Sequence, residues 1–273
     1  MTNLLAVDFK RIRKDKLFFV MCLLAGIFAL ITPLLYALML GDMEDALEML
    51  GMSVNAKSQF FASFSLGNNF GLIAPVLLAI ILCKDFNHGT IRNKLISGKT
   101  RTSIVLSMFT VCFVTLFGIV LLHAFLTMGV SLIFFPYQST PFDLASLGYF
   151  LLSLALELLL YLFLAALVTW LCTVMKNVGL VIVGYIAIIM VLTIFTTILQ
   201  AVGMVLSFEE GNETALKVIE FFQSINVFNF ATVIGAGEKY ETVQLLKCIL
   251  VPLIGTGALM GWSLLKFKRK DLK

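Results

Sequence analysis

Residues 178–206 read VGLVIVGYIAIIMVLTIFTTILQAVGMVL and contain no charged side chain. An α-helix needs about 20 residues to cross the roughly 30 Å of hydrocarbon in a bilayer, so this stretch is long enough to span one. A membrane-spanning strand would alternate apolar and polar residues, whereas this stretch is apolar on every face. It therefore predicts a transmembrane helix.

The composition of the whole chain agrees with this prediction. Of its 273 residues, 60% are hydrophobic and 13% are charged, compared with about 25% charged in ordinary soluble domains. Phe alone occurs 25 times, and a soluble fold of this length has too little interior to bury so much apolar surface. The composition excludes a soluble globular protein and a disordered one, and it favours one transmembrane unit.

Five further apolar runs are long enough to cross a bilayer. The first is expected to be a retained span and not a cleaved signal, because mostly polar residues precede it and no small-residue cleavage site follows it. We predict an all-α membrane protein, a single transmembrane domain over residues 1–273 with spans at about 17–40, 60–83, 104–131, 147–174, 178–206 and 245–265.

Lys and Arg residues are distributed unevenly between the two sides of this layout. If both termini lie on one side, that side holds residues 1–16, 84–103, 175–177 and 266–273, with 16 of the 20 basic residues. Cytoplasmic loops are enriched in Lys and Arg in this way. We expect a multi-pass protein of a bacterial plasma membrane, with both termini cytoplasmic and the basic side against anionic lipid headgroups. A nucleic-acid partner is not expected, because no segment offers a folded basic surface with stacking aromatics.

Residue types that carry chemistry are sparse. The five cysteines lie in or beside apolar runs without C-x-x-C spacing, and the chain has two histidines, His88 and His123, where a zinc site needs three protein ligands or more. Residues 98–100 (GKT) end like a phosphate-binding loop, but Asn93 stands where that motif needs its first Gly. We therefore expect no enzyme activity, metal or bound cofactor in this chain.

Residues 4–16, LLAVDFKRIRKDK, predict a short amphipathic helix. Leu5, Phe9 and Ile12 fall on one face at a period of 3.6, and the basic residues point elsewhere. Such a helix lies in the headgroup plane with its apolar face toward the hydrocarbon. The alternative is a generic positively charged anchor that precedes the first span.

Residues 84–101, KDFNHGTIRNKLISGKTR, predict a short helix between the second and third spans. Thr90 is expected to cap its N-terminus, and Gly98 suits the left-handed position past its C-terminus. Ile91 and Leu95 share one face, and basic side chains flank it. An apolar ridge with basic flanks fits a groove on another protein. The alternative is a helical loop that lies on the membrane.

This loop resembles that of the ABC-2 type permeases of ATP-binding-cassette transporters. The shared pattern is an acid, three residues, Gly-Thr, an apolar helix, a turn and an Arg. The six-span layout, the N-terminal helix and the long last outer loop extend the resemblance over the whole chain. In this sequence the pattern consists of Asp85, Gly89, Thr90, Ile91, Leu95, Gly98 and Arg101, with Asp85 where Glu is more usual and Gly98 where many members have Pro.

The resemblance implies that residues 85–97 form a coupling helix that docks on a separate ATPase subunit, which would bind ATP and Mg²⁺. It also implies that residues 4–16 form the interfacial elbow, that Lys176-Asn177 makes a smaller contact, and that a second permease chain, the same or related, completes the transporter. The residues implied in coupling are Asp85, Phe86, Gly89, Thr90, Ile91, Arg92, Lys94, Leu95 and Arg101, and those of the elbow are Leu5, Phe9 and Ile12.

Several polar residues are expected inside the membrane. Glu157 lies about 15 Å deep in the fourth span, where an ionised carboxylate costs on the order of 3 kcal/mol. Glu157 has two possible functional roles, as a contact to the substrate or as the partner in an interhelical hydrogen bond that changes during transport. The alternative is a structural role, in which a neutral Glu157 is hydrogen-bonded to a neighbouring helix. His123 is expected to be a packing or interfacial residue. Asn68, Asn69 and Gln200 are expected to hydrogen-bond between helices.

The outer loop, residues 207–244, is long for so compact a bundle. Asn212 is expected to cap a helix over residues 213–222. Residues 227–234 are apolar but too short to span, which is typical of a re-entrant or interfacial segment. By the resemblance, this region would form an outer gate.

The preferred hypothesis is the permease subunit of an ABC-2 exporter that moves a hydrophobic or amphipathic compound, such as a peptide antibiotic, out of the cell. One alternative is an ATP-independent channel or secondary transporter, which would need an ion site near the middle of the membrane. The other is a membrane anchor or sensor without transport activity. The helix within residues 85–97 distinguishes these hypotheses, because only the ABC-2 exporter requires it to dock on an ATPase.

Overall fold

The computed structural model describes residues 2–40, 55–66, 69–137, 143–175, 177–206, 213–227, 229–230, 234 and 240–268. Within these ranges every regular element is a helix, which confirms the all-α prediction. Four short helices are α1 (Thr2–Lys14), α4 (Ala56–Ala62), α6 (Thr90–Ile96) and α10 (Glu213–Gln223). Six helices are long and apolar enough to cross a membrane, namely α2 (Lys16–Leu40), α5 (Asn69–Asn87), α7 (Arg101–Phe134), α8 (Leu144–Met175), α9 (Val178–Leu206) and α12 (Thr242–Lys268).

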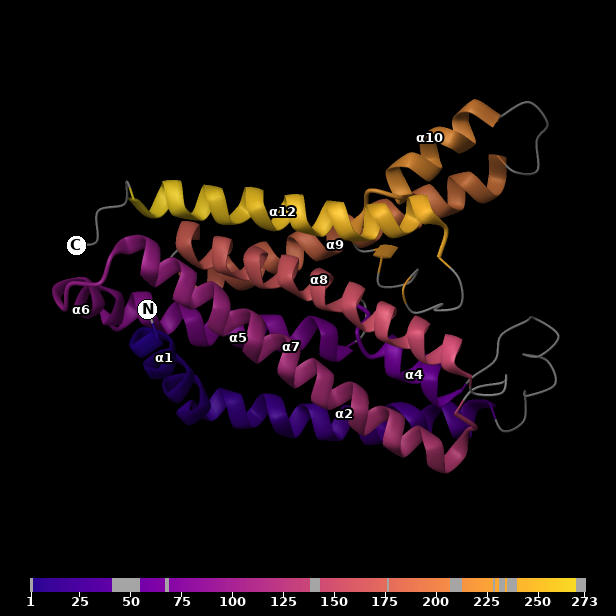
Figure 1. Ribbon diagram of the computed structural model, residues 1–273, viewed down its shortest axis with the longest axis horizontal. Coiled ribbons are helices and arrows are strands. Elements are labelled where there is room, and N and C mark those ends of the chain that lie inside the picture. The colour runs from indigo at the N-terminus through magenta and orange to yellow at the C-terminus, as the bar shows by residue number, and fades with distance from the viewer. Residues whose placement is uncertain are drawn as a thin grey trace.

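The long helices run along the longest axis of the molecule (Figure 1). α1 and α6 gather at one end, together with the last turn of α12, and we call this the α6 end. α4 and α10 lie toward the opposite end. The described parts of the segments that the sequence placed on one side of the membrane therefore lie at one end of the molecule.

α7 and α8 supply most of the core, whereas α2 and α9 bury only narrow rows of side chains. Large apolar side chains on the outer helices, such as Leu23, Val183 and Ile254, are exposed. Apolar surface of this extent is suited to lipid and not to water. The six apolar helices and this surface are those of a membrane protein.

The second span differs from its prediction over residues 60–83. Its first part belongs to α4, and α5 begins only at Asn69. A Cβ on Gly71 would lie 2.3 Å from the carbonyl oxygen of Ser65, so the chain makes a tight backbone approach that only glycine permits. The membrane-length helix is therefore shorter than the apolar run.

The aromatic residues of α4 and the turn after it pack inside the bundle, not along a continuous span. Phe60, Phe61 and Phe64 are fully buried, and the ring of Phe60 lies 5.1 Å from that of Phe150 on α8. Packed aromatic rings are favourable beyond the area they bury. The Ala56 N–H also donates to the Pro136 carbonyl at 3.0 Å, which ties α4 to the end of α7.

In the outer loop, α10 occupies Glu213–Gln223, close to its predicted bounds, while the predicted cap Asn212 lies outside the described residues. Phe230 and Ile234, from the segment predicted to be re-entrant, are buried against Leu156 of α8 and Cys248 of α12. This part of residues 207–244 thus packs onto the bundle.

Candidate functional site

Five polar side chains from four helices meet at the α6 end, and we call them the charge cluster. Lys94 of α6 donates to Asp8 of α1 at 2.7 Å and to Asp85 of α5 at 3.4 Å. The Ser107 hydroxyl of α7 donates to the other Asp8 oxygen at 2.7 Å. Arg11 of α1 forms an ion pair with Asp85. One network therefore joins α1, α5, α6 and α7.

Most of the charge cluster is buried, and only the Arg11 side chain, 31% exposed, reaches the surface. Asp8 and Asp85 are each 2% exposed and Lys94 is 8% exposed. Burial lowers the pKa of Lys94 and the nearby Arg11 acts in the same direction, while the hydrogen bond to Asp8 opposes them. Burial likewise lowers the pKa of Arg11, against the attraction of Asp8 and Asp15. Buried charges are tolerated only with partners, so the four helices must keep this arrangement.

α1 turns a face that carries Leu4, Asp8 and Ile12 toward the bundle, at intervals of four residues. The predicted apolar face consisted of Leu5, Phe9 and Ile12, of which Ile12 is buried and the other two are partly buried. The inward face is therefore rotated toward Asp8, whose partners lie on that side. Asp8 was not predicted to belong to the site, although it lies on the same helix face as the apolar residues Leu4 and Ile12, one turn to either side.

A second ion pair connects the junction of α1 and α2 to α5. Asp15 accepts from the Leu17 N–H at 3.0 Å and so caps the start of α2. Lys84 of α5 donates to both Asp15 oxygens, at 2.7 and 2.9 Å. Partial burial of Asp15 opposes its ionisation, but the hydrogen bonds from Lys84 and Leu17 outweigh this effect and lower its pKa. The junction is thus pinned to α5.

The ends of α6 are set by two glycines. Gly98 has φ of +81°, which confirms the predicted left-handed turn past the helix. The predicted N-cap was wrong, because Gly89, with φ of +68°, precedes the helix and Thr90 is its first residue. No side chain caps this end. Two glycines in conformations that other residues rarely adopt thus delimit the short helix.

The apolar ridge of α6 faces its own bundle. Ile91 is buried in the core and Leu95 packs partly against it, so the ridge predicted for a partner is used internally. Lys94, expected as a basic flank, lies inside the charge cluster. Side chains on the opposite face are exposed, above all Ile96 at 75% with Arg92 beside it. The surface that α6 offers to a partner is therefore centred on Ile96.

Two other residues implied in coupling attach the end of α12 to this region. Phe86 packs edge-on against Phe267, with ring centres 6.3 Å apart. Arg101 donates to the carbonyls of Phe267 at 3.0 Å and Lys268 at 2.7 Å. Carbonyls at a helix C-terminus lack partners within the helix and attract cations. Arg101 therefore stabilises the last turn of α12.

Glu157 lies in the interior of the bundle on α8 and is fully buried. Neither of its carboxyl oxygens has a hydrogen-bond partner within the described residues. One turn earlier on α8, the Ser153 hydroxyl bonds the Tyr240 hydroxyl. A buried carboxyl group without a partner is rare enough in proteins to mark a position of interest.

The other polar residues predicted inside the membrane have different environments. His123 is buried, with Nδ1 3.0 Å from the Ala25 carbonyl and its ring 4.6 Å from that of Phe70, so it is a packing residue in this structure. Gln200 lies on an exposed face of α9, and Asn68 lies outside the described residues. Asn226, which follows the end of α10, instead donates to Thr196 of α9 at 2.6 Å.

Within the described residues, no three His, Cys, Asp or Glu side chains lie close enough together to hold a metal ion. All five cysteines are free. The residues brought together at the α6 end link α1, α5, α6 and α7 through ion pairs and hydrogen bonds.

The chain belongs to the family described as "Protein of unknown function (DUF2705)", which matches residues 18–273. That description assigns no activity to the family. No curated protein and no solved structure matches the chain.

Proposed function

We propose that this DUF2705 member is the transmembrane permease subunit of an ABC-2 type, ATP-driven exporter. The observation that carries the proposal is the way in which α6 is attached to the bundle. This helix projects at the α6 end with Ile96 exposed, while Lys94 on its other side is bonded to α1 and α5. A docking helix needs an exposed contact side chain and a rigid attachment, and α6 has both.

The charge cluster is suited to transmit a displacement of α6 to the membrane-spanning helices. Asp8 accepts from Lys94 and from Ser107, so α6 cannot shift without disturbing both α1 and α7. α7 is the longest described helix and passes through the core. In the proposed cycle, closure of the ATPase subunits moves α6, and the bundle follows through this network and through Ile91.

The partners follow from the same proposal. A separate ABC ATPase supplies ATP and Mg²⁺ chemistry at the α6 end. A second permease chain pairs with the first, and Gly257 and Gly261 of α12 offer a fitting surface, because they are exposed and a Cβ on either would meet nothing within 4 Å. Small residues four apart let membrane helices approach closely.

The remaining parts of the proposal concern place and cargo. Both termini lie in the cytoplasm of a bacterium, and α1 is the elbow at the headgroup level. The segment that contains Phe230 and Ile234 is a re-entrant outer gate. The cargo is hydrophobic or amphipathic, such as a peptide antibiotic, and moves outward between two bundles.

The first test is purification from the native host in mild detergent, with mass spectrometry of the proteins recovered in near-equal amount. We expect a P-loop ATPase at one copy per permease chain. Recovery of the permease alone, even after crosslinking, would favour a channel or a membrane anchor.

The second test is Ile96→Asp. A charge at the centre of the contact should cost about 2 kcal/mol of association free energy, or roughly thirtyfold in ATPase binding. The matched control is Leu144→Asp, which places the same charge at a position 85% exposed at the first residue of α8. Equal ATPase binding by the two variants would contradict docking on α6. Ile91→Asp is unsuitable, because Ile91 is buried and its loss would affect folding.

A further inference from the structure

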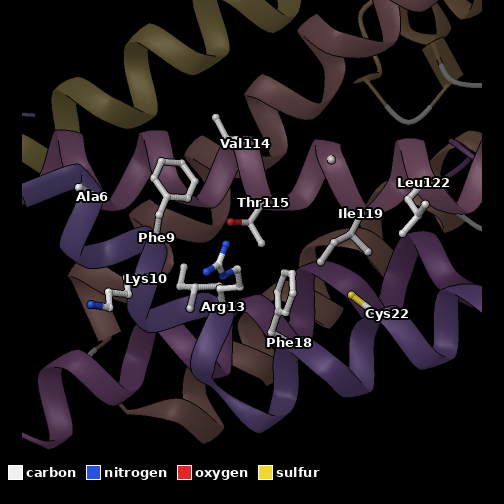
Figure 2. A pocket seen from close by; sticks show the side chains of 12 residues that line it. Ala6, Phe9, Lys10, Arg13, Phe18, Cys22, Val114, Thr115, Ile119 and Leu122 are labelled. Atoms are coloured by element: carbon white, nitrogen blue, oxygen red, sulfur yellow. The ribbon is translucent and has the colours of Figure 1, made fainter.

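A groove runs between α1, α2 and α7 beside the charge cluster. Its volume is about 600 Å³, within the roughly 300–1,000 Å³ of typical ligand sites. Figure 2 shows Phe9, Phe18, Ile119 and Leu122 along its walls. The walls are therefore apolar over most of their length.

The groove opens onto the outer surface of the bundle. Val114 and Leu122 line it and are exposed on α7. In a membrane protein, an apolar surface that faces outward from the spans meets lipid tails. An occupant with a hydrocarbon chain can therefore enter from the bilayer.

One cation reaches into this apolar groove. In Figure 2 the Arg13 guanidinium points toward Thr115, between Phe9 and Phe18. Its neighbours at the α6 end use the described acids there, since Asp8, Asp15 and Asp85 pair with Lys94, Lys84 and Arg11 respectively. Arg13 has no carboxylate within ion-pair distance in the described ranges. Its charge is therefore available to an anion from outside the chain.

A hydroxyl group lies opposite that cation. Thr115 is 8% exposed, lines the groove, and has no hydrogen-bond partner for its hydroxyl in the part of the chain that the structure describes. Lys10 also lines the groove, but its ammonium group points away from Thr115 in Figure 2. Arg and a hydroxyl together suit phosphate and ester oxygens, because the guanidinium gives charge-assisted hydrogen bonds.

We propose that this groove binds one anionic phospholipid. Its phosphate accepts from Arg13, the Thr115 hydroxyl donates to a phosphate or glycerol-ester oxygen, and an acyl chain lies along Phe18, Ile119 and Leu122. Apolar walls and an outward opening favour a lipid over a soluble anion. The site does not depend on the proposed transport function, since the same groove would bind lipid in a channel or an anchor.

The test uses the full chain purified in detergent, with thermal unfolding followed during addition of lipid. Phosphatidylglycerol should raise the midpoint more than phosphatidylcholine does, and inorganic phosphate should leave it unchanged. Lipid retained through purification should be enriched in anionic species. An equal shift with both lipids, or a shift with inorganic phosphate of the same size, would overturn the proposal.

Three variants separate the site from general surface charge. Arg13→Gln should weaken phosphatidylglycerol binding about tenfold, the usual scale for a lost charge-assisted hydrogen bond. Lys14→Gln removes the adjacent exposed charge, which lies outside the groove, and should leave binding unchanged. Gly118→Phe should block the groove, because a Cβ there meets nothing within 4 Å and the ring has room to enter. Equal losses for Arg13→Gln and Lys14→Gln would overturn the proposal, and so would full binding by Gly118→Phe.

Discussion

Lys94 connects residues that lie far apart in the sequence. Its ammonium group donates to Asp8, which is 86 residues away, and Asp8 accepts from Ser107, which is 99 residues away. All three side chains are buried. A buried ion pair contributes little over an apolar pair of the same shape, but removal of one partner strands the other charge. The cluster therefore fixes the relative positions of its helices more than it adds to stability.

Lys94→Met should destabilise the protein by about 3–5 kcal/mol, because Asp8 would remain buried without its cation. The measurement is the thermal unfolding midpoint of the purified chain in detergent. The double variant Asp8→Asn, Lys94→Met should recover most of the loss, since it leaves no stranded charge. The control Lys99→Met removes a cation just past α6 that forms no ion pair with any residue that the structure describes. If Lys94→Met and Lys99→Met unfold at the same temperature, the cluster is not the constraint described above.

At the residue scale, the sequence predicted which residues belong to the site better than it predicted what they contact. Asp85 and Lys94 were both selected, and both lie in the cluster. Their partners Asp8 and Ser107 were missed, because no spacing rule relates residues on different helices. Lys94 was expected as a basic flank of the apolar ridge formed by Ile91 and Leu95. In the structure Lys94 lies inside the bundle because it pairs with Asp8 of α1 and Asp85 of α5.

The break between α4 and α5 illustrates the element scale. Residues 60–83 are apolar enough to suggest one helix, yet the chain turns after Ala62 and resumes at Asn69. The turn places the Ser65 carbonyl against Gly71. Phe60 and Phe64 gain a buried aromatic environment through this turn, with Tyr161 5.9 Å from Phe64. Packing therefore overrides the continuity of the hydrophobic run.

Gly71→Ala should disrupt this turn, because its methyl group would lie 2.3 Å from a backbone oxygen that no side-chain rotation can move. We expect loss of several kcal/mol and poor recovery of folded protein, as for other severe steric conflicts. Gly26→Ala is the matched control on α2, where a Cβ meets nothing within 4 Å. That control should be neutral or stabilise by up to about 1 kcal/mol, the helix-propensity difference. Comparable midpoints for the two variants would show that the turn tolerates a side chain.

Helix positions were predicted well wherever hydropathy alone decides them. α9 matches residues 178–206, and α7, α8 and α12 each extend about three residues or fewer beyond the predicted ends. Solvation by lipid acts on each stretch independently, so a local sum of apolar residues finds these helices. The turn after α4 depends on a contact between Ser65 and Gly71. The summed hydropathy of a stretch does not include contacts of this kind, so it cannot predict the turn.

At the scale of the whole molecule, the sequence did not reveal which helices would be central. α8 and α9 are similarly apolar, yet α8 is largely buried while α9 exposes most of its surface. In lipid, the core and the outer surface favour the same side chains, so apolar periodicity carries little information about packing. The buried Glu157 is the exception, because a polar group identifies the interior face of α8.

The positions of Lys and Arg make one prediction about the whole molecule. The α6 end carries the basic segments and is expected to lie in the cytoplasm. Lys99→Cys lies at that end, and Leu144→Cys lies at the start of α8 toward the other. In intact cells, a membrane-impermeant maleimide should label Leu144→Cys and spare Lys99→Cys, and permeabilised cells should label both. The unsubstituted chain, whose cysteines are mostly buried, gives the baseline.

The labelling pattern also constrains the function. An ATPase of the cell interior can reach Ile96 only if the α6 end is cytoplasmic. Labelling of Lys99→Cys in intact cells would place α6 outside and remove docking from the possible roles of that helix. The proposal that the groove binds a lipid would still hold in the reversed orientation, because Arg13 and Thr115 would then face the headgroups of the outer leaflet. Orientation thus separates the two proposals, because only ATPase docking requires the α6 end to be cytoplasmic.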